Sequence, residues 1–152
     1  MTGMSGTGKS SALERLGLLG FRTVDTDESD WTEWSEADGG YVWREEQMAE
    51  LLGGGDGPPL YVSGTVSNQG RFYDRFDAVV LLSAPASVLF SRIETRTTNP
   101  YGKTAAQREL VRRDLAEVEP RLRRTCTHEI DATQPLADVV TQLAELGRDP
   151  SA

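Results

Sequence analysis

The stretch Gly3-Met4-Ser5-Gly6-Thr7-Gly8-Lys9-Ser10 decides the fold of this chain. It matches the pattern G-x-x-x-x-G-K-[ST] at every fixed position, and Ser11 follows it directly. Its glycines let consecutive backbone N–H groups turn toward an anion, because no Cβ atoms obstruct the approach. A helix that begins directly after the loop adds partial positive charge at the same point. The pattern therefore predicts a loop that holds a polyphosphate.

Two side chains of this loop have chemical roles of their own. Lys9 is expected to reach the β- and γ-phosphates of ATP, and the Ser10 hydroxyl is expected to ligate Mg²⁺. ATP and Mg²⁺ are therefore the expected cofactors. A glycine-rich turn beside a helix, without any ligand, is the structural alternative. The residues expected to bind ATP at the loop are Gly3, Met4, Ser5, Gly6, Thr7, Gly8, Lys9, Ser10 and Ser11.

Composition limits the classes of protein that fit. The chain has 152 residues, of which 38% are hydrophobic and 26% charged, which is enough for one domain with one core. Its net charge of −8 argues against a general nucleic-acid binder. Residues 78–90 form the longest apolar stretch, which falls short of the roughly 20 residues of a membrane span. With no signal peptide and a single cysteine, Cys126, a cytoplasmic protein that binds no membrane is expected, and its oligomeric state is open.

Acidic and basic residues are unevenly distributed. Residues 25–50 hold ten acidic side chains and one base, Arg44, whereas residues 92–124 hold nine bases. This distribution predicts one lobe that repels anions and another that attracts them. Solvated helix faces, on which neighbours three or four residues apart form pairs, are the alternative.

Short apolar strands alternate with helical segments along the chain. Residues 26–40, which are acidic and rich in tryptophan, predict a loop or a short helix. The alternation predicts an α/β fold in three layers, with a mostly parallel sheet of about four to five strands covered on both faces. Helices are expected at residues 9–19, 42–52, 86–95, 104–123 and 135–146, and strands at 23–25, 60–62, 78–82 and 128–130.

A buried strand normally leads into such a loop, but only Met1 and Thr2 precede Gly3. Either the natural chain begins about six residues earlier, or the sheet lacks a central strand and neighbouring elements hold the loop. The first interpretation is favoured, because a central gap would leave backbone hydrogen-bonding groups unpaired. Under the second interpretation, stability and activity would both be in doubt.

With this loop, the helix after it and the next strand, the chain resembles the nucleoside-monophosphate kinase and shikimate kinase group. The resemblance follows the element order over nearly the whole chain. It implies a single P-loop NTPase domain over residues 1–152, with an acceptor-side insertion at about 28–58 and a short lid at about 97–103. The implied activity is transfer of the γ-phosphate of Mg-ATP to a small-molecule hydroxyl or phosphate acceptor. The alternative is a nucleotide-binding regulatory ATPase without a small-molecule acceptor, because the strand at 60–62 runs into Ser63 and not into an aspartate.

The stretch Gly20-Phe21-Arg22-Thr23-Val24-Asp25-Thr26-Asp27 is similar to a stretch of shikimate kinases that ends in Asp-x-Asp. By that resemblance, Asp25 helps to hold Mg²⁺, and Asp27 orients or deprotonates the acceptor hydroxyl. The residues agree with this role, because two carboxylates at the carboxyl end of a strand face the crevice where α/β sheets bind ligands. An acidic turn that caps the strand is the alternative.

Residues 92–103 look similar to adenylate kinases, in which Arg-x-x-x-Arg ends a helix before a lid. By resemblance, Arg92 would stack on adenine and Arg96 would contact the transferring phosphate, so that Lys9, Arg96 and Asp27 form the catalytic set. A planar, permanently charged guanidinium suits both positions. Pairing of these arginines with Glu94 or with solvent is the alternative. After the last strand, Thr133 to Pro135 would form a base-binding edge.

The acceptor side departs from the shikimate kinase pattern, because no glycine triplet follows the strand at 60–62. The acidic surroundings favour a neutral or cationic hydroxyl compound over a nucleotide. Three tryptophans in the insertion suit a sugar face, a base or a cation, or else form a small satellite core. The candidate acceptor-binding residues are Asp27, Arg44, Ser67, Asn68 and Arg71.

Overall fold

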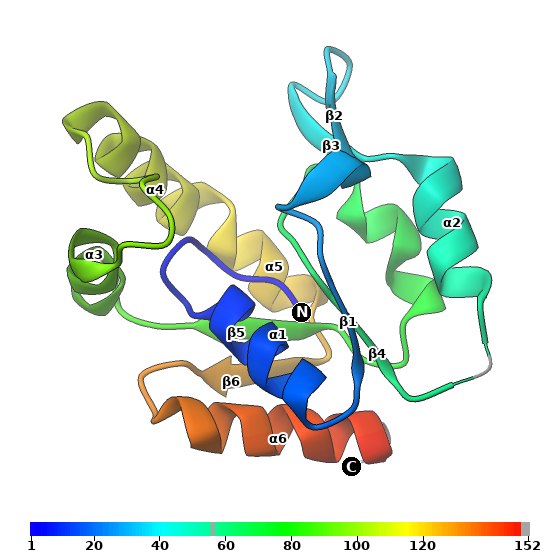
Figure 1. Cartoon of the computed structure of the whole chain (residues 1–152). Coiled ribbons are helices and arrows are strands. Elements are labelled where there is room, and N and C mark those ends of the chain that lie inside the picture. Colours follow the sequence, from blue (N-terminus) through cyan, green and yellow to red (C-terminus); the bar gives the residue numbers. More distant parts are fainter. Residues whose placement is uncertain (56, 150–152) are drawn as a thin grey trace.

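The computed structural model of the protein describes residues 1–55 and 57–149 as alternating helices and short strands (Figure 1). The strands are β1 (Arg22–Asp25), β2 (Thr32–Ser35), β3 (Gly40–Trp43), β4 (Leu60–Ser63), β5 (Val80–Ser83) and β6 (His128–Asp131). The helices are α1 (Lys9–Leu18), α2 (Glu45–Gly53), α3 (Ala86–Thr95), α4 (Ala105–Glu117), α5 (Glu119–Thr125) and α6 (Leu136–Arg148), and 3₁₀ turns form η1 (Ser29–Trp31) and η2 (Gln69–Arg75).

The first two residues join two pairs of parallel strands. Strand β1 pairs with β4, and β5 pairs with β6. The Thr2 N–H donates to the Val80 carbonyl at 2.8 Å, and the Leu82 N–H donates to the Thr2 carbonyl at 2.9 Å. On the other side, the Gly64 N–H donates to the Met1 carbonyl at 3.3 Å. This arrangement confirms the mostly parallel sheet and places a short central segment directly before the loop.

Helices cover both faces of this sheet. In Figure 1, α1 lies in front of the strands, α6 runs below β6 at the bottom of the view, and α5 lies behind the strands. The main apolar cluster joins these layers through fully buried side chains, among them Leu16 of α1, Leu82 of β5 and Leu143 of α6. Burial of a leucine side chain contributes roughly 1.5–3 kcal/mol. Because Met4 belongs to the same cluster, the core fixes the phosphate-binding loop between the start of α1 and β5.

A second apolar cluster supports the region of residues 28–58. Trp43 and Met48 pack there with Val62 and Phe72, and the Trp43 ring lies edge-on to Phe72 at 5.8 Å between centroids. The Trp43 indole N–H also donates to the Thr26 hydroxyl at 2.8 Å. The satellite-core interpretation of the tryptophans is therefore confirmed for Trp43.

The structure corrects the predicted elements of residues 26–52. Residues 32–43 form an antiparallel hairpin of β2 and β3, in which Trp34 lies opposite Tyr41, in place of a loop or a short helix. The predicted helix at 42–52 begins only at Glu45, because Val42 and Trp43 belong to β3 and are buried. Cross-strand pairing and the burial of Val42 and Trp43 override the helical spacing of the sequence.

The long helix predicted at residues 104–123 is two helices. Helix α4 ends at Glu117 and α5 begins at Glu119, with Pro120 in its first turn. Proline has no N–H to continue the helical hydrogen bonds, but it fits a first turn. The turn η2 was not predicted, whereas the helix at 86–95 has the predicted bounds. Among the described helices, none combines the length and the apolar character that crossing a membrane would require.

Candidate functional site

The loop at residues 3–10 lines a cleft with a volume of about 750 Å³. Gly6 and Gly8 have φ values of 89° and 91°, in the left-handed region where glycine has no Cβ penalty. Gly8 precedes the first turn of α1, and no side chain of the described residues caps that helix. The first backbone N–H groups of α1 have no partners inside the helix. This donor set is chemically suited to phosphate oxygens.

The Lys9 ammonium lies against the backbone of the same loop. It donates to the carbonyl of Gly3 at 2.6 Å and to that of Met4 at 3.4 Å. Withdrawal from solvent lowers the pKa of Lys9, and the carboxylates of Asp27 and Asp25 partly offset this effect. Because the direct partners are neutral carbonyls, the charge of Lys9 is not cancelled by an ion pair.

A hydroxyl and two carboxylates lie at the carboxyl end of β1. The Ser10 hydroxyl donates to Asp25 Oδ2 at 2.7 Å, and the Asp27 N–H donates to Asp25 Oδ1 at 3.2 Å. Mg²⁺ in nucleotide sites takes one or two such oxygen ligands, with phosphates and waters completing its shell. The Ser10 and Asp25 oxygens therefore fit this ion. No group of three or more His, Cys, Asp and Glu side chains in residues 1–55 and 57–149 could hold a metal alone.

The Asp27 carboxyl lines the same cleft as the Lys9 side chain. Loss of solvent contact raises the pKa of Asp27, with the neighbouring Asp25 adding to the rise and Lys9 opposing it. A carboxylate with a raised pKa is a better proton acceptor than an ordinary one. The position and the pKa of Asp27 thus suit a general base.

Arg92, in the last turn of α3, and Arg96, directly after that helix, both line the cleft. Arg92 donates to the Ala132 carbonyl at 2.7 Å, and Arg96 donates to the Ser5 hydroxyl at 3.1 Å. The predicted alternative partner, Glu94, instead lies 3.8 Å from Arg108. Both cleft arginines therefore have neutral oxygen partners, and their charges are open to an anion.

The segment 97–103 contributes Thr98, Asn99 and Tyr101 to the lining of the cleft. Arg96 holds it through the carbonyls of Asn99 at 3.0 Å and Tyr101 at 2.6 Å. The next helix, α4, begins with a capping box in which Thr104 and Gln107 satisfy each other's backbone N–H groups. The segment thus links the phosphate-binding loop to α4.

The predicted base-binding edge is only partly at the cleft. Gln134 lines it, as do Ala132 and Leu136, whereas Thr133 and Pro135 are absent from its lining. The Thr133 N–H donates instead to Asp131 Oδ1 at 2.8 Å, which fixes the turn after β6.

Sequence reasoning missed Thr65 and Asp114, which also line the cleft. Burial raises the pKa of Asp114, the effect of Arg113 opposing it. Neither residue belongs to a motif. The only sequence signal for Asp114 is that it shares α4 with several arginines, and this does not indicate which face of the helix meets the cleft.

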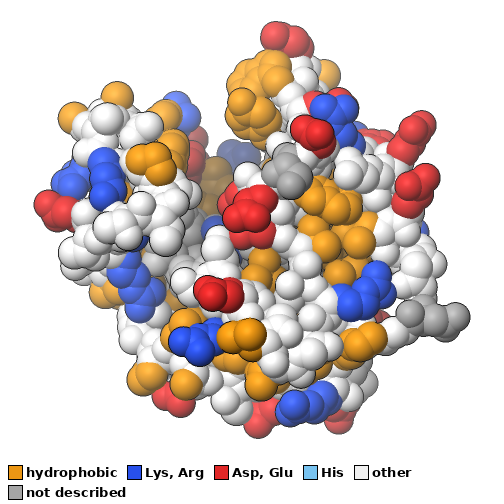
Figure 2. All heavy atoms as spheres, in the orientation of Figure 1, with side chains coloured by type: hydrophobic (Ala, Val, Ile, Leu, Met, Phe, Trp, Pro, Cys, Tyr) orange, Lys and Arg blue, Asp and Glu red, His pale blue; other side chains and the backbone are white. Residues whose placement is uncertain are grey.

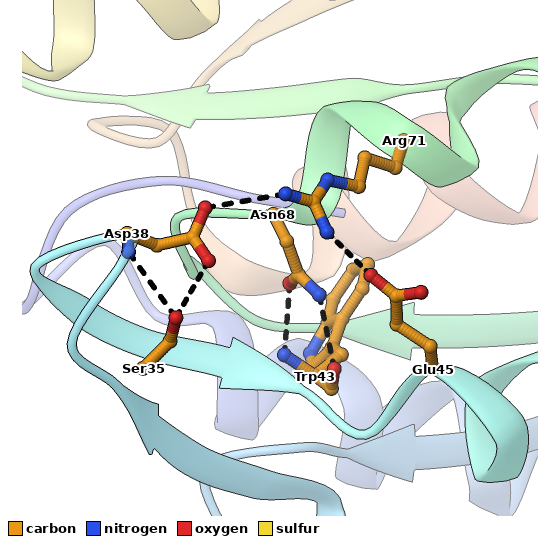
Figure 3. A network of polar contacts seen from close by, with 6 residues as sticks. All are labelled: Ser35, Asp38, Trp43, Glu45, Asn68 and Arg71. Atoms are coloured by element: carbon orange, nitrogen blue, oxygen red, sulfur yellow. Dashed lines mark hydrogen bonds and ion pairs between the residues drawn. The ribbon is translucent and has the colours of Figure 1, made fainter.

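Asn68 and Arg71 lie outside this lining and connect elements of the acceptor side (Figure 3). The Asn68 amide accepts from the Trp43 N–H at 2.8 Å and donates to the Trp43 carbonyl at 2.9 Å. Arg71 pairs with Glu45 and, at 3.4 Å, with Asp38. These contacts hold η2 against β3 and the start of α2, which is a structural role that the sequence did not suggest.

The other two acceptor candidates also have partners away from the cleft. Arg44 forms an ion pair with Glu33 at 3.0 Å. The Ser67 N–H donates to the Tyr41 carbonyl at 3.0 Å, and its side chain is exposed. Of the acceptor-binding residues proposed from the sequence, only Asp27 lines the cleft.

The fold and the site together define a P-loop α/β protein: a parallel sheet, a glycine-rich loop leading into α1, and free cations around that loop. A family model described as an AAA domain matches residues 1–119. The chain therefore belongs to this family. No curated protein matches the chain in sequence.

Solved kinase structures share this fold. Shikimate kinase from Acinetobacter baumannii in complex with shikimate superposes with a TM-score of 0.63 and 17% identity, over 99% of this chain and 92% of that one. A gluconokinase from Sinorhizobium meliloti 1021 gives a TM-score of 0.53 and 23% identity, over 99% of this chain and 95% of that one. These likenesses confirm the predicted fold class.

Proposed function

We propose that this protein is an ATP-dependent phosphotransferase that moves the γ-phosphate of Mg-ATP to a hydroxyl group of a small molecule. The observation that carries the proposal is that Lys9, Arg96 and Asp27 meet in one cleft beside the phosphate-binding loop. The names of the two structural relatives, a shikimate kinase and a gluconokinase, support phosphoryl transfer as the reaction of this fold.

The nucleotide would lie along the loop. The N–H groups at the start of α1 would bind its phosphates, and Arg92 would lie at the adenine, near the 132–136 segment. Ser10 and Asp25 would hold Mg²⁺, which when bound neutralises charge on the β- and γ-phosphates. A cleft of about 750 Å³ is within the range of nucleotide and drug-sized sites.

In the reaction, Asp27 accepts the proton of the acceptor hydroxyl. The hydroxyl oxygen then bonds to the γ-phosphorus as the bond from that phosphorus to the β–γ bridging oxygen breaks, and ADP leaves. The charged groups of Lys9 and Arg96 stabilise the negative charge on the transferring group. The 97–103 segment, acting as a short lid, would exclude water from this step.

The test is a pair of measurements on the whole chain. Calorimetry measures binding of ATP with Mg²⁺, and a coupled assay measures ADP release with a panel of hydroxyl compounds. Release of ADP that depends on one class of hydroxyl compound, with a phosphorylated product in the mass spectrum, is the expected result. Slow hydrolysis that no compound alters would instead support the regulatory ATPase, and absence of ATP binding would refute both functions.

A further inference from the structure

Building on the proposed function, we infer the charge class of the acceptor: it is a hydroxyl compound that is neutral or bears a protonated amine, and not a carboxylate or a phosphate ester. The inference rests on a difference between the cations that line the cleft and the two arginines beside the neighbouring hairpin, which lie outside its lining.

On the nucleotide side, the cations contact only neutral oxygens. Lys9 donates to backbone carbonyls, Arg92 donates to the carbonyls of Gly6 and Ala132, and Arg96 donates to a hydroxyl and to carbonyls. Neutral acceptors orient a cation without cancelling its charge. This side is therefore ready to receive an anion, as ATP requires.

On the acceptor side, the two arginines beside the hairpin form ion pairs with carboxylates. Arg44 is paired with Glu33, and Arg71 lies between Asp38 and Glu45. The Asp38 carboxylate is itself fixed, because it accepts from the Ser35 hydroxyl at 2.7 Å (Figure 3). To bind an anionic acceptor, Arg71 would have to leave two carboxylates at once.

The turn η2, which carries Arg71, is anchored as well. Asn68, at its start, is buried and bonded to both backbone groups of Trp43, and Gln69 accepts from the Val66 N–H at 2.9 Å. A rigid base for the Arg71 side chain limits how far its guanidinium can travel toward the cleft. Arg75, the next base of η2, donates to the Ala49 carbonyl and lines a separate cavity of about 260 Å³.

Carboxylates that form no ion pair within the described part of the chain also lie on this side. Asp27 lines the cleft, and Glu28, Asp30 and Glu36 are exposed, with no ion pair to any described residue. Their field opposes a second anion beside the nucleotide and attracts a protonated amine.

The hairpin also offers aromatic surface. Trp34 and Tyr41 are 56% and 61% exposed, with ring centroids 5.5 Å apart. In Figure 2, hydrophobic side chains gather on this hairpin beside the hollow of the molecule. Exposed aromatic faces bind the apolar face of a polyol or a cation, and their negative π-faces do not attract a carboxylate.

The first experiment compares related acceptors of different charge, such as glucose, glucosamine and gluconate, together with shikimate and further sets of neutral, amine and carboxylate compounds. Binding is measured with Mg-ADP present and turnover with Mg-ATP. We expect the neutral or amine member of a set to exceed its carboxylate by about tenfold or more. A carboxylate or phosphate ester as the best acceptor overturns the inference, as does ATP binding with no response to any member.

The second experiment frees Arg71. The double variant Asp38→Asn/Glu45→Gln removes its two partners, and Glu46→Gln/Glu50→Gln removes equal charge from exposed positions of α2 that have no ion pair. Carboxylate binding should rise about tenfold in the first variant and much less in the control. Equal gains, or no gain in either, would refute the role of these pairs. Failure of the phosphotransferase proposal would appear separately, as a parent chain that binds no ATP or whose ADP release no acceptor of any charge alters.

Discussion

The cations that line the cleft and the cations beside the hairpin have opposite kinds of partner. Beside the phosphate-binding loop, Lys9, Arg92 and Arg96 are oriented by carbonyl and hydroxyl oxygens, so that their charges face the cleft unmatched. At the hairpin, Arg44 and Arg71 are cancelled by carboxylates. The number of arginines alone would suggest that both regions bind anions. Their partners show the difference: the cations at the loop can bind an anion, whereas those at the hairpin hold the structure together.

The difference has a physical origin in how far apart the partners are in sequence. The loop is one contiguous segment, so its amides, Lys9 and the start of α1 are brought together by local geometry. The acceptor side is assembled from β1, the hairpin, α2 and η2, and Arg71 meets Glu45 across 26 residues of chain. Ordering such a long-range set depends on the whole fold.

The largest expected effect comes from removing the central cation of the nucleotide side. Lys9→Met should reduce kcat/KM for ATP by about 10³-fold, because a preorganised donor to the transferring phosphate is lost. Arg15→Met removes an exposed cation from the same helix and should leave activity unchanged. Steady-state kinetics decide the matter, with circular dichroism to establish that both variants fold. Equal losses would mean that helix charge in general, and not the loop, supports the activity.

The next largest effect should distinguish the role of Asp25, at the end of β1, from that of Asp27, in the turn that follows. Asp27→Asn should lower kcat by about 10²-fold while ATP still binds, because the proton acceptor is removed. Burial raises the pKa of Asp27, so wild-type activity should fall as the pH decreases through a pKa above that of an ordinary aspartate. The variant should lose this fall, which is the acid limb of the pH–rate profile.

Asp25→Asn is the matched comparison, since it should raise the Mg²⁺ concentration needed for half-maximal rate without removing the acid limb. A pH–rate profile at several Mg²⁺ concentrations tests both variants. If the acid limb persists in Asp27→Asn, another group is the base.

Smaller effects should distinguish the two arginines at the end of α3. Arg96→Met should lower kcat about tenfold to a hundredfold, since a charge-assisted contact made in the transition state is lost. Arg92→Met should instead raise KM for ATP with a smaller change in kcat, because its contact would be with the bound base. The split between kcat and KM is the measurement, and identical patterns in the two variants would contradict the separate roles.

These contrasts also show what the sequence could predict. The loop, the four parallel strands β1, β4, β5 and β6, and the bounds of α3 depend on local pattern, and each was predicted. The hairpin was missed because its pairing, Trp34 with Tyr41, is a relation between strands whose residues favoured a loop and a helix. The role of Asn68 was missed for the same reason. The sequence does not indicate that the side-chain amide of Asn68 forms hydrogen bonds with both backbone groups of Trp43, which is distant along the chain.

The break at Pro120 was visible in the sequence, but it was placed within one long helix, although the missing N–H makes a new first turn the better choice. Thr65 and Asp114 needed the fold itself, because only packing determines which face of a loop or a helix lines the cleft.

The smallest expected effect tests the scaffold side and is on stability. Asn68→Ala leaves the buried N–H and carbonyl of Trp43 without their partners, which should cost about 1–3 kcal/mol of unfolding free energy. The midpoint of thermal unfolding should then fall by several degrees.

Ser67→Ala removes an exposed hydroxyl from the adjacent position and should change stability by less than about 0.5 kcal/mol. Denaturant unfolding measures both variants, and the KM for ATP should be unaltered in each. If Asn68→Ala were as stable as the parent chain but bound the acceptor less well, Asn68 would be an acceptor ligand. The division into a nucleotide side with open charges and a rigid, charge-matched hairpin would then be wrong at this residue, because its amide would have to turn from Trp43 toward the cleft.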